Sequence, residues 1–461
     1  MRLHDQVALN AAAQQSGFLV PIYCLDPRHF ANNEWGLPKT GRFRAKFLFE
    51  SLLDLKRSLR DLGSDLLILH GKPEVLIPEL AKKIRAEAIF FSEEVTDQEV
   101  RVVKALEAAV EKIGIKTEPI WQQSLFHIQD LPFPVSETPD VFTAFRKDLE
   151  KSSRVRPAHP VRTSLTLPKI ELDWENFPDA SSLGFDLTEP TPMGTIEFKG
   201  GETEGLRRVQ TYLWELDAIK DYKHTRNGLL GANYSSKFSP WLALGCISPR
   251  FIYWEIMRYE KERTKNESTY WLVFELIWRD YFRFIAKKHG NKIFGPSGIK
   301  PLAKPWRTDE KLFWRWAKAQ TGIPFVDANM RELNATGFMS NRGRQNVASF
   351  LVNDLGIDWR WGASYFESLL IDYDVCSNWG NWMYIAGVGN DPLENRYFNI
   401  NKQARTYDDR GEYVRNWIPE LKYIPDDYIH CPIALTSSDL ERYGVYLGSS
   451  YPFPMVDLPK T

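Results

Sequence analysis

The hydrophobic pattern of this 461-residue chain changes once, near Gly205, and this change constrains the fold more than any other feature. Before Gly205, amphipathic stretches alternate with short apolar runs, namely FLVPIYCL, LLILHG, AIFFS and TEPIW. Such alternation predicts a parallel α/β sheet, and fully apolar strands fit burial on both faces. After Gly205 the pattern is helical almost throughout, to about Lys422. We therefore expect an α/β domain followed by an all-helical domain.

The chain is too long for one ordinary hydrophobic core, so at least two domains are expected. Residues 131–205 are rich in Pro, Ser, Thr and Gly and show little periodicity, which is typical of a connector on the surface. We predict an α/β domain over 1–130, a connector over 131–205, a helical domain over 206–425 and a tail over 426–461.

Composition excludes several classes of protein. The 59 basic residues nearly balance the 60 acidic ones, so any nucleic-acid surface must be a local patch. The four cysteines show no CxxC spacing, which argues against a disulfide scaffold and a compact metal site. Neither a membrane-length apolar run nor a signal peptide is evident. We expect a monomer in the cytoplasm, or in an organelle if a targeting peptide was removed.

The segment 341–384 combines acids, amides and tryptophans at close intervals, in NRGRQNVASFL, DWRWG and IDYDVCSNWGNWMY. Arg344 facing Asp372, Asp374 and Asn378 would build a buried polar pocket, which is costly unless each group finds a partner. The three residues at i, i+2 and i+6 cannot share one helix face, so we expect them to wrap around a ligand edge. The natural partner is a large polar cofactor.

This segment resembles the flavin pocket of the photolyase/cryptochrome family, most closely that of cryptochromes of the DASH type. The resemblance covers nearly the whole chain and implies FAD, blue-light chemistry and a DNA substrate. It also implies a Rossmann-like antenna domain before the helical FAD domain. By resemblance Asp372 pairs with Arg344 beside the isoalloxazine, Asp374 contacts its polar edge and Asn378 faces N5. An amide there tolerates negative charge on a reduced flavin better than a carboxylate does.

The amino terminus departs from the family pattern. Family members usually begin with a strand similar to VWFRNDLRLHD, whereas this chain begins with MRLHD. Either the start was assigned late or the sheet is unusual. A sheet without its central strand would leave backbone groups unpaired.

The motif YSSKFSPWLALG supplies serines, a lysine and free amides where a helix begins, with Ser239 as the expected N-cap before Pro240. This suits a pyrophosphate, although locally it also reads as an ordinary capped helix. Similarity to the family motif TSxLSP favours phosphate binding by Ser235, Ser236, Lys237, Phe238 and Ser239. Two further positions match the family: Tyr222, which closes over the flavin, and Arg226, near the DNA entrance.

Three tryptophans, Trp382, Trp359 and Trp306, match the electron-transfer chain of the family, from proximal to exposed. They could equally be core anchors, because Trp314, Trp316 and Trp361 lie nearby in the sequence. Only the motif match selects the carriers.

In ELIWRDYFRF, Glu275, Trp278 and Arg279 share one helix face, offering an acid, a stacking plane and a cation. This suits a flipped pyrimidine pair beside DNA phosphates, although amphipathic helices often present such a face to another helix. In the family this segment contacts both FAD and lesion, with Glu275 bonding a thymine edge and Trp278 stacking on it.

Two residues resemble the DASH type rather than photolyases acting on duplex DNA: Tyr384 replaces a second stacking Trp, and Gln345 replaces Met. A smaller, more polar wall recovers less of the unstacking cost, so we predict repair of cyclobutane pyrimidine dimers in single-stranded or looped DNA. The stretch FMSNR lacks the histidine that (6-4) repair needs. By resemblance its Asn341 and Arg342 belong to the DNA-contacting loop.

In FSEEVTD, Glu94 matches the carboxylate that holds methenyltetrahydrofolate in DASH-type proteins. Glu93 competes for this role, and an exposed acidic pair is often only a solvated strand end. The alternative function is a photoreceptor that binds DNA and regulates transcription without significant repair. A light-independent flavin oxidoreductase is less favoured, because no GxGxxG fingerprint is present.

Overall fold

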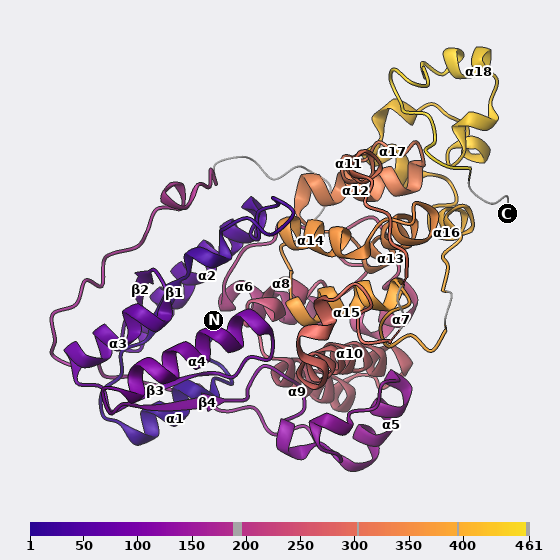
Figure 1. Cartoon of the computed structure of the whole chain (residues 1–461). Helices are drawn as coiled ribbons and strands as arrows, with labels where there is room; N and C mark the ends of the chain where they lie inside the picture. Colours follow the sequence, from indigo (N-terminus) through magenta and orange to yellow (C-terminus); the bar gives the residue numbers. More distant parts are fainter. Residues whose placement is uncertain (188–195, 302–303, 394–395, 458–461) are drawn as a thin grey trace.

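The computed structural model describes residues 1–187, 196–301, 304–393 and 396–457. The α/β domain lies on one side and the helical domain on the other, with the carboxyl-terminal segment projecting beyond the helices (Figure 1). Both predicted domains are therefore present.

The α/β domain contains four short parallel strands, each at a predicted position. Of the helices in this domain, the apolar pattern did not predict the first, because its sequence VALNAAAQQ has only a weak apolar face. The elements are α1 (Val7–Gln15), β1 (Ile22–Leu25), α2 (Arg42–Asp61), β2 (Leu67–His70), α3 (Pro73–Ile84), β3 (Ala88–Ser92), α4 (Asp97–Glu111) and β4 (Lys116–Ile120).

The strands form two separate pairs rather than one sheet. β1 pairs with β2, placing Ile22 beside Leu67, and β3 pairs with β4, placing Ala88 beside Lys116. No ladder joins the pairs within the described residues. The predicted parallel sheet is therefore present as two strand pairs in the described residues.

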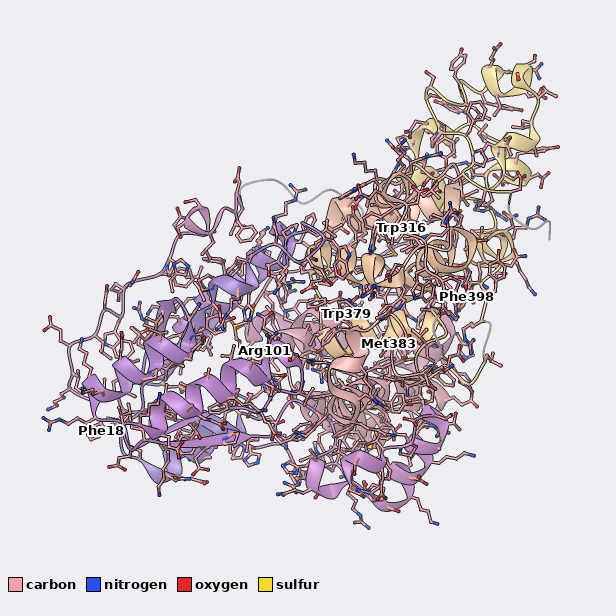
Figure 2. All side chains as sticks on the ribbon, in the orientation of Figure 1. Phe18, Arg101, Trp316, Trp379, Met383 and Phe398 are labelled. Carbon is pink, nitrogen blue, oxygen red and sulfur yellow. The ribbon has the colours of Figure 1, made fainter. Side chains whose placement is uncertain are left out.

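The helical domain is built around the long helix α10, whose start carries a capping box of Asn266 and Thr269. Trp316, Trp379 and Met383 lie among these helices (Figure 2) and are buried. The helices are α6 (Glu202–Gln210), α7 (Tyr222–Thr225), α8 (Ser239–Ala243), α9 (Pro249–Glu262), α10 (Glu267–His289), α11 (Glu310–Ala317), α12 (Pro324–Thr336), α13 (Asn341–Ser349), α14 (Trp359–Leu369), α15 (Val375–Ile385), α16 (Ile400–Tyr407) and α17 (Glu412–Trp417).

The segment expected to be an irregular connector contains the helix α5 (Phe142–Ser152). Its residues Phe142, Phe145 and Leu149, spaced three and four apart, are buried. Because α5 contacts α10, part of this segment belongs to the helical domain.

The carboxyl-terminal segment, with α18 (Ser437–Arg442), is folded against the helical domain. Tyr451 is buried, and its hydroxyl donates to Asp327 Oδ2 at 2.8 Å. Met455 N also donates to Thr321 O, so the described part of this segment is anchored on α12 and the turn before it.

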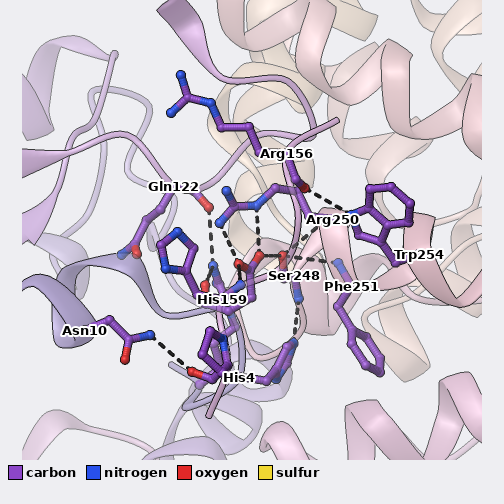
Figure 3. A network of polar contacts seen from close by, with 12 residues as sticks. His4, Asn10, Gln122, Arg156, His159, Ser248, Arg250, Phe251 and Trp254 are labelled. Carbon is purple, nitrogen blue, oxygen red and sulfur yellow. Dashed lines mark hydrogen bonds and ion pairs between the residues drawn. The ribbon is translucent and has the colours of Figure 1, made fainter. Parts of the chain in front are cut away.

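A buried polar network joins the two domains (Figure 3). Asp5 accepts from Arg250 Nη2 at 2.7 Å, and both side chains are almost fully buried. His4 Nε2 accepts from Ser248 N at 3.0 Å, while His4 Nδ1 lies 2.5 Å from a Glu202 oxygen. A neutral imidazole with its proton on Nδ1 satisfies both contacts.

Within the described residues, no helix is long and apolar enough to cross a membrane.

Candidate functional site

A cavity of about 310 Å³ lies within the helical domain, within the size range of ligand pockets. It is lined from α7, α8, α10, α13, α14 and α15 and from the loops beside them. It brings together most of the site residues that the sequence predicts: Tyr222, Arg226, Ser235, Ser236, Lys237, Phe238, Ser239, Glu275, Arg279, Asn341, Arg344, Gln345, Asp372, Asp374, Asn378 and Trp382.

The predicted pair of Arg344 and Asp372 is present. Arg344 Nη2 donates to both carboxylate oxygens of Asp372, at 3.0 and 2.8 Å, and Arg344 Nε donates to Met339 O. Gly343 allows α13 to approach α12, because a Cβ at 343 would lie only 1.9 Å from Asn329 Oδ1. A glycine is therefore required beside Arg344.

Asp374 is the N-cap of α15 and accepts from Ser377 N at 2.8 Å. Burial opposes ionisation, yet the pKa of Asp374 is lowered, chiefly by the nearby Arg279 guanidinium and by the Ser377 amide. Asn378 lies one turn along α15, and its Nδ2 donates to Ala363 O at 3.0 Å. With the amide nitrogen engaged, the amide oxygen is the end that can accept a hydrogen bond from a ligand.

The predicted phosphate loop has a different local geometry from the one expected. Ser239 is the first residue of α8 rather than its N-cap, because Phe238 occupies the N-cap position without a side-chain cap. Lys237 has a positive φ of 54°, which directs the chain sharply at this point. Sequence reasoning missed the residue that holds the loop: Arg208 donates to Ser236 O and Ser235 O at 3.0 and 3.2 Å.

Lys237 carries an ammonium group that forms no salt bridge among the described residues, although the Glu332 carboxyl lies near enough to raise its pKa. Its side chain is buried, and none of the residues that the structure describes forms a hydrogen bond with Nζ. Nζ lies 3.8 Å from the ring centroid of Tyr234 and 4.6 Å from that of Phe338. Burial lowers the pKa of Lys237. An anionic group in the cavity would give this lysine the partner it lacks.

Arg226 and Glu275 form an ion pair at the side of the cavity. Burial raises the pKa of Glu275, and Arg226 opposes this rise. The Arg226 guanidinium also lies 5.4 Å from the Trp271 ring centroid. The acid expected to contact a base is therefore paired with the cation expected to contact a phosphate.

Trp278 does not line the cavity but stands beside it. Its ring stacks on Phe142 with centroids 3.6 Å apart and planes 10° apart, and Tyr384 meets it edge-on at 5.9 Å. Phe142 of α5 thus covers one face of Trp278. No local signal indicated this contact, which joins residues more than 130 positions apart.

The predicted DNA loop has mixed surroundings. Arg342 donates to Asn227 Oδ1 at 3.1 Å, and its guanidinium lies 4.5 Å from the Tyr407 ring centroid. Gln345 Oε1 is buried without a hydrogen-bond partner among the described residues. Tyr384 Oη accepts from Arg396 Nη2 at 3.2 Å. These groups give the region beside the cavity a cationic, hydrogen-bonding character.

Of the three predicted tryptophans, only Trp382 lines the cavity, whereas the Trp359 ring meets that of Trp379 at 5.6 Å. Trp382 packs against α14 at Gly362, where a Cβ would lie 2.2 Å from its ring. Trp359 and Trp306 donate to the same acceptor, Pro296 O, at 3.2 and 2.9 Å. Trp382 and Trp359 are both buried, whereas Trp306 is half-buried.

The aromatic rings that contact Trp382 are those of Phe366, at 5.0 Å and 80°, and of Trp316. The Trp316 ring lies 6.3 Å away at 79°. Geometry alone therefore does not single out the Trp382, Trp359 and Trp306 series.

Glu94 lies at the junction of the domains, outside the cavity. Its Oε2 lies 2.9 Å from Arg283 Nη2 of α10, and its Oε1 accepts from Gln123. Burial raises the pKa of Glu94 despite Arg283. Glu93 pairs separately with Lys287 at 2.7 Å. Both acids thus face the helical domain, rather than ending a solvated strand.

The chain matches two family models. Residues 1–164 match the DNA photolyase model, and residues 271–461 match the FAD binding domain of DNA photolyase. The chain is 50% identical to Cryptochrome DASH of Synechocystis sp., over 99% of this chain and 93% of the relative. It is also 50% identical to Cryptochrome DASH of Gloeobacter violaceus, over 99% and 91%. A crystal structure of a Synechocystis cryptochrome superposes with a TM-score of 0.95, at 51% identity over 99% of this chain and 94% of that one.

The cavity residues fit the FAD that these matches imply. The partnerless Lys237 ammonium suits the diphosphate, and the oxygen of Asn378, the Arg344–Asp372 pair and Asp374 suit a polar ring system. The chain therefore belongs to the photolyase/cryptochrome family, as a cryptochrome of the DASH type with an FAD-binding helical domain.

Proposed function

We propose that this protein uses blue light to repair cyclobutane pyrimidine dimers in single-stranded or looped DNA. The observation that carries the proposal is the position of Glu275, which lines the FAD cavity and pairs with Arg226 beside it. An acid that borders both a flavin and a cationic entrance can contact a base that has been turned into the cavity.

The chain's own residues hold the cofactor and set its surroundings. Lys237 and the loop 235–239 bind the diphosphate, and Tyr222 closes the cavity wall. Arg344, Asp372, Asp374 and Asn378 would hold the ring system by hydrogen bonds, and the Asn378 oxygen is free to accept one. When bound, FAD would supply the light-driven electron that splits the cyclobutane ring and would recover it afterwards, so that repair is redox-neutral.

DNA enters beside α10 and α13. Arg226, Asn341 and Arg342 bind phosphates, and Arg279 adds positive charge near the lesion. Trp278 stacks on one pyrimidine with the ring face that Phe142 leaves uncovered. Glu275 hydrogen-bonds the edge of the same base.

The preference for unpaired DNA follows from two side chains. Gln345 Oε1 is buried with no partner in the described part of the chain, so it favours a polar group. The Tyr384 ring stands edge-on to Trp278 rather than parallel to it. A lesion taken from a duplex must lose pairing and stacking, at a cost of a few kcal/mol. This wall returns little of that cost, so a base that is already unpaired is favoured.

Trp382, Trp359 and Trp306 carry electrons between the cavity and the surface. The support is the position of Trp382 at the cavity and the Pro296 carbonyl shared by the other two. The protein acts as a monomer on its DNA.

Glu94 holds an antenna folate at the domain junction. If the Glu94 carboxylate exchanged its contact with Arg283 for one with a pterin, it would still have a hydrogen-bonding partner. Folate fluorescence that is released on denaturing the purified protein, and lost in Glu94→Gln, would support this assignment. Folate retained at full occupancy by Glu94→Gln would remove Glu94 from it.

Repair must be separated from light sensing without turnover. Excess dimer-containing oligonucleotide is illuminated with the FAD-loaded protein, and products are counted per protein molecule. We expect many products per molecule in light and none in darkness. Stoichiometric binding without product would favour a photoreceptor that regulates transcription.

A further inference from the structure

Helix α2 belongs to the α/β domain, but its first turn packs into the helical domain. In Figure 1, α2 runs from the strand pairs toward α14, which it contacts. A Cβ at Gly41, the N-cap of α2, would lie 2.1 Å from Ser368 O. Two residues later, the Phe43 side chain packs against Gly337. A Cβ at Gly337 would lie 2.7 Å from the Cβ of Phe43. Two glycines thus permit this close docking.

Arg44 reaches the end of α14 from this docked turn. The side chain is buried, with the residue 8% exposed. Its Nη1 donates to Glu367 O at 2.7 Å and to Leu370 O at 3.2 Å. The last carbonyls of a helix have no partner within the helix, and a cation at this end is also favoured by the helix dipole. An arginine from one domain therefore caps a helix of the other.

The same guanidinium covers the ring of Tyr373, at 4.7 Å from the centroid. Tyr373 lies between Asp372 and Asp374 in the sequence, and all three line the FAD cavity. The other end of Tyr373 is also held, because Trp379 Nε1 donates to its hydroxyl at 3.3 Å. The short loop 370–374 is thus fixed by Arg44 at Leu370 and again at Tyr373.

We infer that Arg44 is a positioning residue for the FAD cavity, through which the α/β domain sets the geometry of loop 370–374. The Arg344–Asp372 pair and the Asp374 cap both depend on that loop. Cofactor affinity therefore depends on a side chain that does not line the cavity. A purely stabilising role for Arg44 would instead lower the unfolding temperature and leave FAD affinity unchanged.

The test uses the FAD-loaded protein and its variants Arg44→Met and Arg44→Lys. The FAD dissociation constant is measured from the fluorescence of free FAD on serial dilution. Losing the cation–π contact and the capping hydrogen bonds is expected to weaken FAD binding about tenfold in Arg44→Met. Arg44→Lys should recover part of the loss, because lysine keeps the charge and one donor direction. Arg57→Met, on the exposed side of α2, is the matched control and should bind FAD as the original chain does.

A double-mutant cycle with Tyr373→Leu shows whether Arg44 acts through the loop. In the Tyr373→Leu background, Arg44→Met should add much less than tenfold to the dissociation constant. An unchanged dissociation constant in Arg44→Met, or fully additive effects in the double variant, would overturn the inference. If Arg44→Met fails to fold, Arg44→Lys is the deciding variant. The inference would then be overturned if Arg44→Lys left both the FAD affinity and the visible circular dichroism spectrum of the bound FAD unchanged.

Discussion

Arg226 and Glu275 are paired with one another at the side of the FAD cavity, although each is expected to face a different part of the DNA. Under the proposed function, lesion binding exchanges this ion pair for a phosphate on Arg226 and a base edge on Glu275. Glu275→Gln should lower kcat/KM for dimer repair by about tenfold or more, the loss expected for a hydrogen bond to a charged group. It should leave the affinity for undamaged single strands equal or higher, because Arg226 is released.

Arg226→Gln provides the opposite signature. It should weaken the binding of damaged and undamaged single strands by a similar factor. The slope of log affinity against log salt concentration should become shallower by about 0.7. The measurement is a titration of both oligonucleotides at several salt concentrations. Selective loss of lesion binding, with an unchanged slope, would contradict the assigned roles.

Lys237 is predicted to be the main electrostatic contact for the diphosphate. Lys237→Met should weaken FAD binding by at least about tenfold, because the phosphate loses a charge-assisted hydrogen bond in a buried site. Burial lowers the pKa of this lysine, so FAD affinity should also fall as pH rises through that pKa and the ammonium loses its proton. Fluorescence titrations between pH 6 and 9 test both points, and a pH slope that persists in Lys237→Met would assign it to another group.

Trp382 is predicted to be the first electron donor beside the cavity. Trp382→Phe should lose nearly all photoreduction of oxidised FAD, as followed by transient absorption. Trp254→Phe is the control, since Trp254 is exposed and its indole nitrogen bonds Arg156 O. Undiminished photoreduction in Trp382→Phe would show that Trp382 is not the electron donor to FAD.

Asp280 holds the two domains together from α10. Its carboxylate accepts from Leu125 N and Phe126 N at 2.9 and 2.8 Å, and it is fully buried. Asp280→Ala leaves two buried amides unsatisfied and should lower the free energy of unfolding by about 2–5 kcal/mol. Chemical denaturation measures this, and Asp280→Asn should cost less because the amide oxygen still accepts one bond.

The pH dependence of this clasp has a defined sign. Burial raises the pKa of Asp280 from 3.8 to about 6, so the folded state binds its proton more tightly than the unfolded state. Stability from this group is present below about pH 4 and is lost as pH rises through about 6. Between about pH 4 and pH 6, the free energy of unfolding of the original chain should fall by up to about 3 kcal/mol relative to that of Asp280→Asn. A difference that is constant with pH would exclude Asp280 as its source.

Local patterns predicted the elements well where the pattern was strong. The four strands and the helices α2, α3 and α4 are at the expected positions, and Arg344 and Asp372 pair as expected. Residues that face one another across a cavity could be predicted only because the segment resembles a known flavin pocket.

The remaining contacts depend on distant parts of the chain. Phe142 covers Trp278, Arg44 reaches Tyr373, and Arg283 pairs with Glu94, yet no periodicity links the members of these pairs. The N-cap assignment of Ser239 was wrong for a local reason. The positive φ of Lys237 moves the helix start, and the sequence offers no glycine there to indicate such a turn.

The central claim is repair of dimers in unpaired DNA, and one rate comparison tests it most directly. The FAD-loaded protein is illuminated with the same thymine dimer in a single-stranded oligonucleotide and in its matched duplex, and kcat/KM is measured for both. We predict repair in the single strand at least about tenfold faster, because the duplex must first supply the few kcal/mol needed to turn the lesion out. Equal rates on the two substrates would contradict the account.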